Sequence, residues 1–183
     1  MKQEIDRMNL LVQRLLEFAK PAQLSLHPVC LSGLVQEVLD FLQGTLVQKQ
    51  IQVTAVFTES DQVLADAGQI KQVFLNLFLN SIEAVECSGH IAISAMRENG
   101  HVRVVMKDTG SGIAKNDLAR VFDPFFTTKL TGTGLGLSVV HSIVREHGGR
   151  VVIQSQTGEG TTVQIHLPMT GGDHGTHPHS DRG

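Results

Sequence analysis

The segment DTGSGI, residues 108–113, combines an acidic side chain with two glycines. Gly110 and Gly112 lack a Cβ, so the backbone there can turn sharply and come close to a ligand. The carboxylate of Asp108 could then accept a hydrogen bond from an exocyclic amine. The same residue types also form an ordinary Asx turn after a strand, and the segment alone does not separate these two interpretations.

Three further glycines, Gly132, Gly134 and Gly136, alternate with other residues in GTGLGL and lead into a predicted helix. Free backbone N–H groups at a helix N-terminus favour phosphate. The segment is not a P-loop, because no Lys-Ser/Thr pair follows, and its spacing is not that of GxGxxG. Taken alone, it is equally well interpreted as a flexible linker.

Asn76 and Asn80 stand four residues apart in NLFLN and project from one face of an otherwise strongly apolar helix. Two amides on such a face need hydrogen-bonding partners. A metal–phosphate group and the backbone of a strand are the two candidates. Glu83 lies one helical turn beyond Asn80 and is placed to reach the same site.

Three phenylalanines fall within five residues of FDPFFTTK, residues 122–129, in a loop flanked by glycines. Apolar side chains of this size should pin a movable loop to the body of the protein. Lys129, and Arg120 just before this segment, could then reach a phosphate. A plain surface position is the alternative for both cations.

The composition excludes several classes of protein. The 183 residues include 15 Lys and Arg against 18 Asp and Glu, and no Trp or Tyr. We therefore expect neither a protein that coats nucleic-acid phosphates nor one that stacks bases. There is no apolar stretch of membrane-spanning length and no secretory leader. Cys30 and Cys87 are far apart and are expected to be buried free thiols, so we predict a soluble domain in the cytoplasm.

A small number of helices and strands must position these residues. Apolar periodicity predicts helices over about 32–50 (with Ser32 as N-cap), 68–86 and 135–147, and strands over 51–57, 90–97, 101–108, 150–156 and 161–167. Residues 109–133 are expected to be irregular. This order predicts an α/β (α+β) two-layer sandwich with a mixed, mostly antiparallel sheet and helices on one face.

The two ends of the chain differ from its middle. Residues 1–20 carry an apolar heptad stripe, which predicts a helix that pairs with another helix and with its copy in a homodimer. Residues 21–30 are expected to be a linker, residues 31–168 the folded domain, and residues 169–183 a disordered tail rich in Gly and His.

In their order and spacing, these segments resemble the catalytic, ATP-binding domain of bacterial sensor histidine kinases. The family belongs to a superfamily with gyrase, the ninety-kilodalton heat-shock chaperone and the mismatch-repair ATPases. NLFLNSIEA is similar to the N box, DTGSGI and GTGLGL to the two glycine boxes, and FDPFFTTK to the phenylalanine box. Among sensor kinases, the sequence most resembles the nitrogen-regulation and zinc-responsive type. Residues 4–21 resemble the second helix of the family's dimerisation domain.

The resemblance implies a Bergerat-type fold that binds ATP and Mg²⁺. Asp108 would bond the adenine amino group, and Asn80 would hold the metal and act in catalysis together with Lys129. Other nucleotide-binding positions implied near these residues are Asn76, Gly110, Gly112, Ile113 and Thr161. Those implied around the phosphates and the lid are Arg120, Thr128, Gly132, Thr133, Gly134, Leu135, Gly136 and Leu137.

Two departures shape the functional hypothesis. Hydrolysing members of the superfamily carry a Glu where this chain has Asn76, which cannot take a proton, so phosphoryl transfer is expected rather than hydrolysis. None of the nine His is followed by an acidic residue, as the family's phosphoacceptor is. The acceptor would then lie on a His-bearing dimerisation helix that this sequence does not contain. The phosphoryl group would then pass to the receiver domain of a response regulator. Whether the parent protein is anchored in the inner membrane is left open by the sequence.

Two other functions compete with the histidine kinase. One is an anti-sigma-factor serine kinase of the same superfamily, against which the phenylalanine box and the heptad helix count. The other is a non-catalytic ATP-binding switch or dimerisation module. Transfer of labelled phosphate to a His separates these three hypotheses.

Overall fold

The computed structural model describes residues 24–57, 61–129 and 132–169. The predicted N-terminal helix (residues 1–20) and nearly all of the Gly/His-rich tail lie outside these residues, so their assignments stay predictions. Within the described part, no helix is long and apolar enough to cross a membrane.

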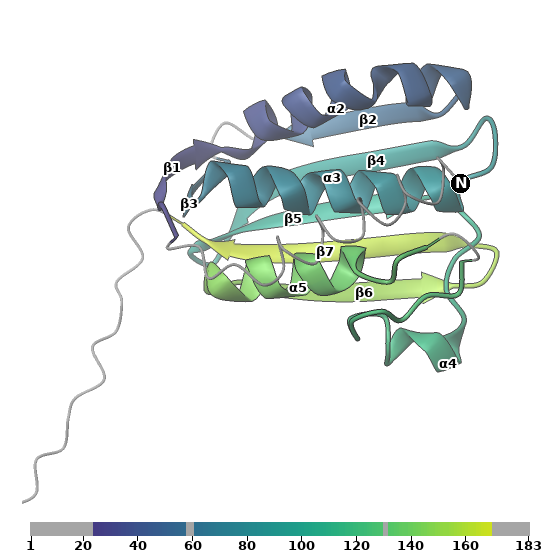
Figure 1. Ribbon diagram of the computed structural model, residues 1–183. Helices are drawn as coiled ribbons and strands as arrows, with labels where there is room; N and C mark the ends of the chain where they lie inside the picture. The colour runs from purple at the N-terminus through teal and green to yellow at the C-terminus, as the bar shows by residue number, and fades with distance from the viewer. Residues whose placement is uncertain (1–23, 58–60, 130–131, 170–183) are drawn as a thin grey trace, which may run out of the picture.

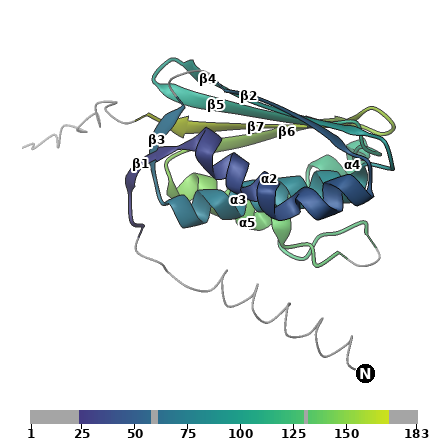
Figure 2. The same ribbon diagram turned by 90° about the horizontal axis from the view of Figure 1, so that it is seen from above.

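The centre of the fold is a five-stranded sheet. Its strands, in spatial order, are β2 (Gln52–Phe57), β4 (His90–Glu98), β5 (His101–Asp108), β7 (Gly160–Pro168) and β6 (Arg150–Gln156). Only β2 and β4 run parallel, and the other neighbours are antiparallel. The helices α2 (Leu31–Gln48), α3 (Ala67–Ala84) and α5 (Gly136–Glu146) all cover one face of this sheet (Figures 1 and 2). The predicted mixed two-layer sandwich is confirmed.

The core lies between the sheet and all three helices, of which α3 is the middle one (Figure 1). Alternate residues of β4, β5 and β7 point towards the helices and are buried, as period-two strands require. Phe74 and Phe78 of α3 are fully buried against them. Burial of a side chain of this size stabilises the fold by about 1.5–3 kcal/mol. Asn76 and Asn80 are therefore carried on a rigidly packed helix.

A small antiparallel ladder was not predicted. β1 (His27–Cys30) pairs with β3 (Gln62–Ala65). The sequence predicts a linker for residues 27–30, and neither segment is long enough to show a strand pattern. The short helix α4 (Lys115–Leu118) was also missed, inside the region expected to be irregular.

The ladder changes how α2 begins. The helix starts at Leu31, its N-cap is Cys30, and Ser32 lies inside the first turn, so the predicted Ser32 cap is wrong. The physical reason is Asp61, next to β3, whose carboxylate accepts the Ser32 N–H at 2.6 Å. Cys30 and Cys87 are free, as expected, but both are exposed rather than buried: Cys30 ends β1, and Cys87 lies in the turn between α3 and β4.

His147 joins α5 to α3. Its ring is buried, its Nδ1 lies 2.8 Å from the Ile143 carbonyl, and its Nε2 accepts the Asp66 N–H at 3.0 Å. Because Nε2 accepts, Nδ1 donates its N–H to the Ile143 carbonyl. Asp66 is itself the N-cap of α3 and accepts the Gln69 N–H at 3.0 Å. The C-terminal end of α5 is thereby fixed to the N-terminal end of α3.

Acid should destabilise the fold through the two capping carboxylates. Burial raises the pKa of Asp61, but hydrogen bonds from Ser32 and Cys30 outweigh it and leave the pKa lowered. The Gln69 N–H lowers the pKa of Asp66. Such groups stabilise the fold above their unfolded-state pKa of 3.8, and this stability is lost as the pH falls through the folded-state value.

The corresponding test is Asp61→Asn, which replaces a charged cap by a neutral one. We expect the free energy of unfolding at pH 7 to fall by about 0.5–2 kcal/mol. Its decline below about pH 4 should become shallower, because one fewer carboxylate gains a proton on unfolding. Urea denaturation from pH 3 to pH 7 measures both. Asp40→Asn, at an exposed position, is the control, and identical pH profiles for Asp61→Asn and the parent would contradict the assignment.

Candidate functional site

A cavity of about 520 Å³ lies between α3, the loop that follows β5, the N-terminus of α5 and the inner face of β6 and β7. Apolar side chains form much of its wall, among them Ile113, Val121, Leu137, Ile153 and Val163. Every candidate site residue from the sequence lines this cavity except Gly110, Leu135 and Arg120. The fold therefore gathers at one place the four segments that the sequence separated by up to sixty residues.

Asp108 ends β5, lines this cavity and is buried. Its Oδ1 accepts the Gly110 N–H at 2.9 Å and the Thr161 N–H at 3.1 Å. Its Oδ2 accepts the Ser81 hydroxyl at 2.9 Å. A carboxylate offers about four lone-pair positions, so these three donors leave one, on Oδ2. The Asx turn is thus present, and the same carboxylate keeps one acceptor position that no donor of the protein uses.

Ser81 is the site residue that sequence reasoning missed. It is buried in α3, directly after Asn80, and its hydroxyl crosses to a strand residue distant in sequence. A small hydroxyl residue on the buried face of an apolar helix was a usable signal, because a buried hydroxyl needs a partner. The identity of that partner could not be read from the sequence.

The loop after Asp108 is held against the hairpin of β6 and β7. Ser155 accepts the Ile113 N–H at 2.8 Å and donates to the Gly160 carbonyl at 2.8 Å. Gly112 has φ +70°, and a Cβ there would collide with the Gln156 carbonyl. Glycine is therefore required at this position for the loop to close the cavity.

The opposite end of the cavity is formed by the two asparagines and the start of α5. A Cβ added to Gly136 would lie 3.4–3.6 Å from amide atoms of Asn76 and Asn80, so α5 begins directly against both side chains. Asn76 donates to the Gln72 carbonyl of its own helix at 3.0 Å. The Nδ2 of Asn80 is buried and has no hydrogen-bond partner among the described residues. In the described structure, neither amide bonds to strand backbone, which was one of the two candidates.

The N-terminus of α5 also has donors to offer. Its N-cap, Leu135, makes no side-chain capping bond. The first N–H groups of a helix have no partner within the helix, and they favour an anion. The Leu135 side chain is buried and does not line the cavity, so its place in a binding site stays a prediction.

Two other predicted residues are turned away from the cavity. Gly110 uses its N–H for the Asp108 carboxylate. The guanidinium of Arg120 lies 4.5 Å from the centre of the Phe126 ring, and its Nε is 3.7 Å from Asp123 Oδ2. Arg120 was expected to reach a phosphate, and in this structure a cation–π contact and an ion pair within its own loop hold it instead.

The phenylalanine segment only partly pins its loop. Phe122 stacks on His141 of α5 with ring centres 4.9 Å apart, and Phe126 lines the cavity. Phe125, in contrast, is 62% exposed and has φ +67°. Lys129, at the end of the segment, lines the cavity, and its Nζ lies 2.6 Å from Oε2 of Glu83 on α3.

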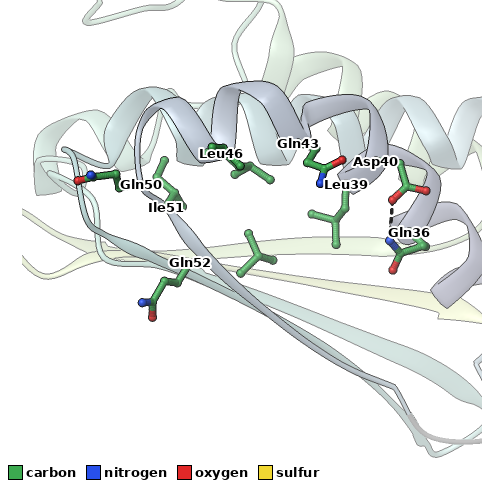
Figure 3. A pocket seen from close by; sticks show the side chains of 10 residues that line it. Gln36, Leu39, Asp40, Gln43, Leu46, Gln50, Ile51 and Gln52 are labelled. Carbon is green, nitrogen blue, oxygen red and sulfur yellow. Dashed lines mark hydrogen bonds between the residues drawn. The ribbon is translucent and has the colours of Figure 1, made fainter.

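A second cavity, of about 490 Å³, lies between α2 and the edge strand β2 (Figure 3). Glutamines and aliphatic side chains line it, and Asp40, the one carboxylate among its described lining residues, accepts a hydrogen bond from Gln36 at 2.8 Å. It contains none of the candidate residues. The cavity bounded by α3 and α5 is therefore the candidate functional site.

Removing the Ser81 hydroxyl should weaken this site and the fold around it. Ser81→Ala leaves the buried Asp108 carboxylate with one donor fewer, and we expect a loss of about 1.5–3 kcal/mol in the free energy of unfolding. Urea denaturation measures the loss. Ser142→Ala, which removes a hydroxyl bonded to the exposed Glu146, is the control and should change stability far less. Equal stabilities for Ser81→Ala and the parent would contradict the contact.

Comparison with known proteins agrees with this geometry. Residues 65–171 match the family described as histidine kinase-, DNA gyrase B-, and HSP90-like ATPase. The chain is 41% identical over 172 residues to the sensor histidine kinase ZraS of Escherichia coli (strain K12), a match that covers 92% of this chain and 37% of that protein. The chain thus spans well under half of the length of this curated relative.

Solved structures give the same result. The catalytic domain of the histidine kinase ThkA is 32% identical, with a TM-score of 0.72 over 79% of this chain and 95% of that one. Full-length ShkA in complex with AMPPNP is 30% identical, with a TM-score of 0.81 over 91% of this chain and 36% of that one. ThkA in complex with the response regulator TrrA is 30% identical, with a TM-score of 0.79 over 92% and 49%. The chain belongs to the histidine kinase-, DNA gyrase B-, and HSP90-like ATPase family.

Proposed function

We propose that this chain is the ATP-binding catalytic domain of a two-component sensor histidine kinase. One observation carries the proposal: a single cavity has a free carboxylate acceptor at one end and an unpaired amide beside an uncapped helix N-terminus at the other. The first suits an amino-substituted base and the second a phosphate chain. The similarity to kinases solved with AMPPNP and with a response regulator supports it.

The adenine end would work by hydrogen bonding and shape. Asp108 Oδ2 would accept one N–H of the exocyclic amine, while the apolar walls, with Ile113 and Val163 among them, would cover the base. Ser81, Gly110 and the Thr161 N–H fix the carboxylate so that this acceptor is aimed before a ligand arrives. Such preorganisation lowers the cost of binding.

The phosphate end fits Mg²⁺. A half-turn of the Asn80 amide exchanges its partnerless nitrogen for an oxygen, a ligand atom that Mg²⁺ accepts. Among the described residues, no cluster of three or more His, Cys, Asp and Glu could hold a metal without help. This suits an ion that binds through one side chain together with substrate phosphates. When bound, the ion would neutralise phosphate charge and help to align the terminal phosphoryl group.

The protein's own residues would position rather than react. The N–H groups at the start of α5 would hold the phosphates, and Lys129 would reach the terminal ones from the loop. The amide nitrogen of Asn76 donates a hydrogen bond to its own helix, and an amide cannot accept a proton from water. We therefore propose transfer to the imidazole of a His on a dimerisation helix, with ADP leaving, and from there to an Asp of a response-regulator receiver domain. The two free thiols suit the reducing cytoplasm, where we place the domain.

The test is phosphorylation of a separate acceptor. Incubated with radiolabelled ATP, this chain should not label itself, because none of its His carries the acidic neighbour of the family's acceptor. It should label an added dimerisation fragment that bears such a His, in an acid-labile form. A fragment with that His replaced by Gln is the control. Acid-stable label on serine would instead favour the serine-kinase alternative, and ATP binding without transfer would favour a switch module.

A further inference from the structure

The phosphate end of the cavity has little positive charge of its own. The charged side chains that line the cavity are Glu83, Asp108, Asp117 and Lys129. Among the described residues that line the cavity, Lys129 is thus the one Lys or Arg, and it is already paired: its Nζ lies 2.6 Å from Glu83 Oε2. Arg120 is engaged with Phe126 and Asp123. A polyanionic ligand would find this cation already paired with a carboxylate of the protein.

The pair spans two different elements. Glu83 follows Asn80 by three residues on α3, so their side chains are neighbours on the helix surface. Lys129 belongs to the loop between β5 and α5, where the Thr127 hydroxyl accepts its backbone N–H at 3.1 Å. The side chain of Glu83 is 57% exposed and that of Lys129 is 39% exposed, so water can solvate each after the pair opens. An exposed pair of this kind can exchange partners at modest cost.

We propose that Glu83 is a positioning residue that competes with the nucleotide phosphates for Lys129. Without nucleotide, Glu83 holds Lys129 and so ties the loop to α3. A nucleotide whose phosphate chain reaches Lys129 takes the ammonium group from Glu83 and frees the loop from this tie. A nucleotide with a shorter chain leaves the pair intact. This inference rests on the proposed function, because it takes the ligand to be an adenine nucleotide.

The exchange predicts a change in selectivity between nucleotides. Glu83→Gln keeps the shape of the side chain but removes its charge, so Lys129 no longer has to be taken from a carboxylate. ATP should then bind about two- to fivefold more tightly, the range expected for an exposed ion pair. AMP should bind as it does to the parent. The preference for ATP over AMP should therefore rise by the same factor, which a purely structural role of Glu83 would not produce.

The experiment is calorimetric titration with ATP and with AMP, in excess Mg²⁺, on the parent, Glu83→Gln, Lys129→Ala and the double variant. Glu37→Gln is the matched control, because it opens another exposed pair, Lys71–Glu37 at 2.7 Å, away from the cavity and with the same change in charge. Circular dichroism checks the fold of each variant. We expect the gain only in Glu83→Gln, and no gain from the same substitution in the Lys129→Ala background.

Each other outcome is informative. An unchanged ATP preference in Glu83→Gln, or the same gain with and without Lys129, would overturn the exchange while leaving ATP binding in place. An equal gain in Glu37→Gln would assign the effect to net charge and would also overturn it. A parent protein that binds neither nucleotide would overturn the proposed function itself.

Discussion

Replacing Asp108 by Asn is expected to weaken ATP binding roughly ten- to hundredfold. The buried carboxylate accepts three hydrogen bonds within the protein and keeps one lone pair on Oδ2 for the ligand. An amide of the same shape has one acceptor oxygen, so its NH₂ group must face either the protein's donors or the amine of the base. A lost hydrogen bond to a charged acceptor costs about 1.5–3 kcal/mol. Calorimetry on the folded variant measures the change.

The same variant should also lose its selectivity for adenine over a 6-oxopurine base. Asp108→Asn presents a donor where the parent presents an acceptor. The affinity for inosine triphosphate, which has a 6-oxo group, should therefore rise relative to the affinity for ATP. Asp117→Asn is the control, because Asp117 lines the same cavity and loses the same charge. Unchanged ATP affinity in Asp108→Asn would remove this residue from adenine recognition.

Replacing Asn80 by Ala is expected to remove most of the tightening of ATP binding by Mg²⁺. The Asn80 amide is buried beside the start of α5 and has no partner in the described structure, so it is available as a ligand. With no further cluster of ligands among the described residues, the ion would lose its one proposed protein contact. The measurement compares ATP affinity in excess Mg²⁺ and in excess chelator, for the parent and the variant.

Asn76→Ala is the matched control for this experiment. It deletes the neighbouring amide, whose nitrogen bonds to the Gln72 carbonyl of the same helix. We expect Asn76→Ala to keep the Mg²⁺ response and Asn80→Ala to lose it. If the ratio of affinities with and without Mg²⁺ in Asn80→Ala equals that of the parent, the metal is held elsewhere.

The sequence by itself determined the fold class and the main elements that carry the site. The helical period placed Asn76 and Asn80 on one face of α3, and the period of two placed Asp108 at the end of β5. Glycines marked the turns that close the cavity, since positive φ and close approach leave few other residue types. These are local rules, which act over a few residues and can be read directly from the order of side chains.

Only the tertiary structure decided which distant residues meet. Ser81 with Asp108, Glu83 with Lys129 and Asp61 with the start of α2 join positions 27 to 46 residues apart. The sequence also left open whether Arg120 lines the cavity or stays within its loop. In the structure it contacts Phe126 and Asp123 of the loop. The physical reason is that a side chain's partner depends on how whole elements pack. A periodic pattern shows which face of an element is buried, but it does not show which residue lies opposite.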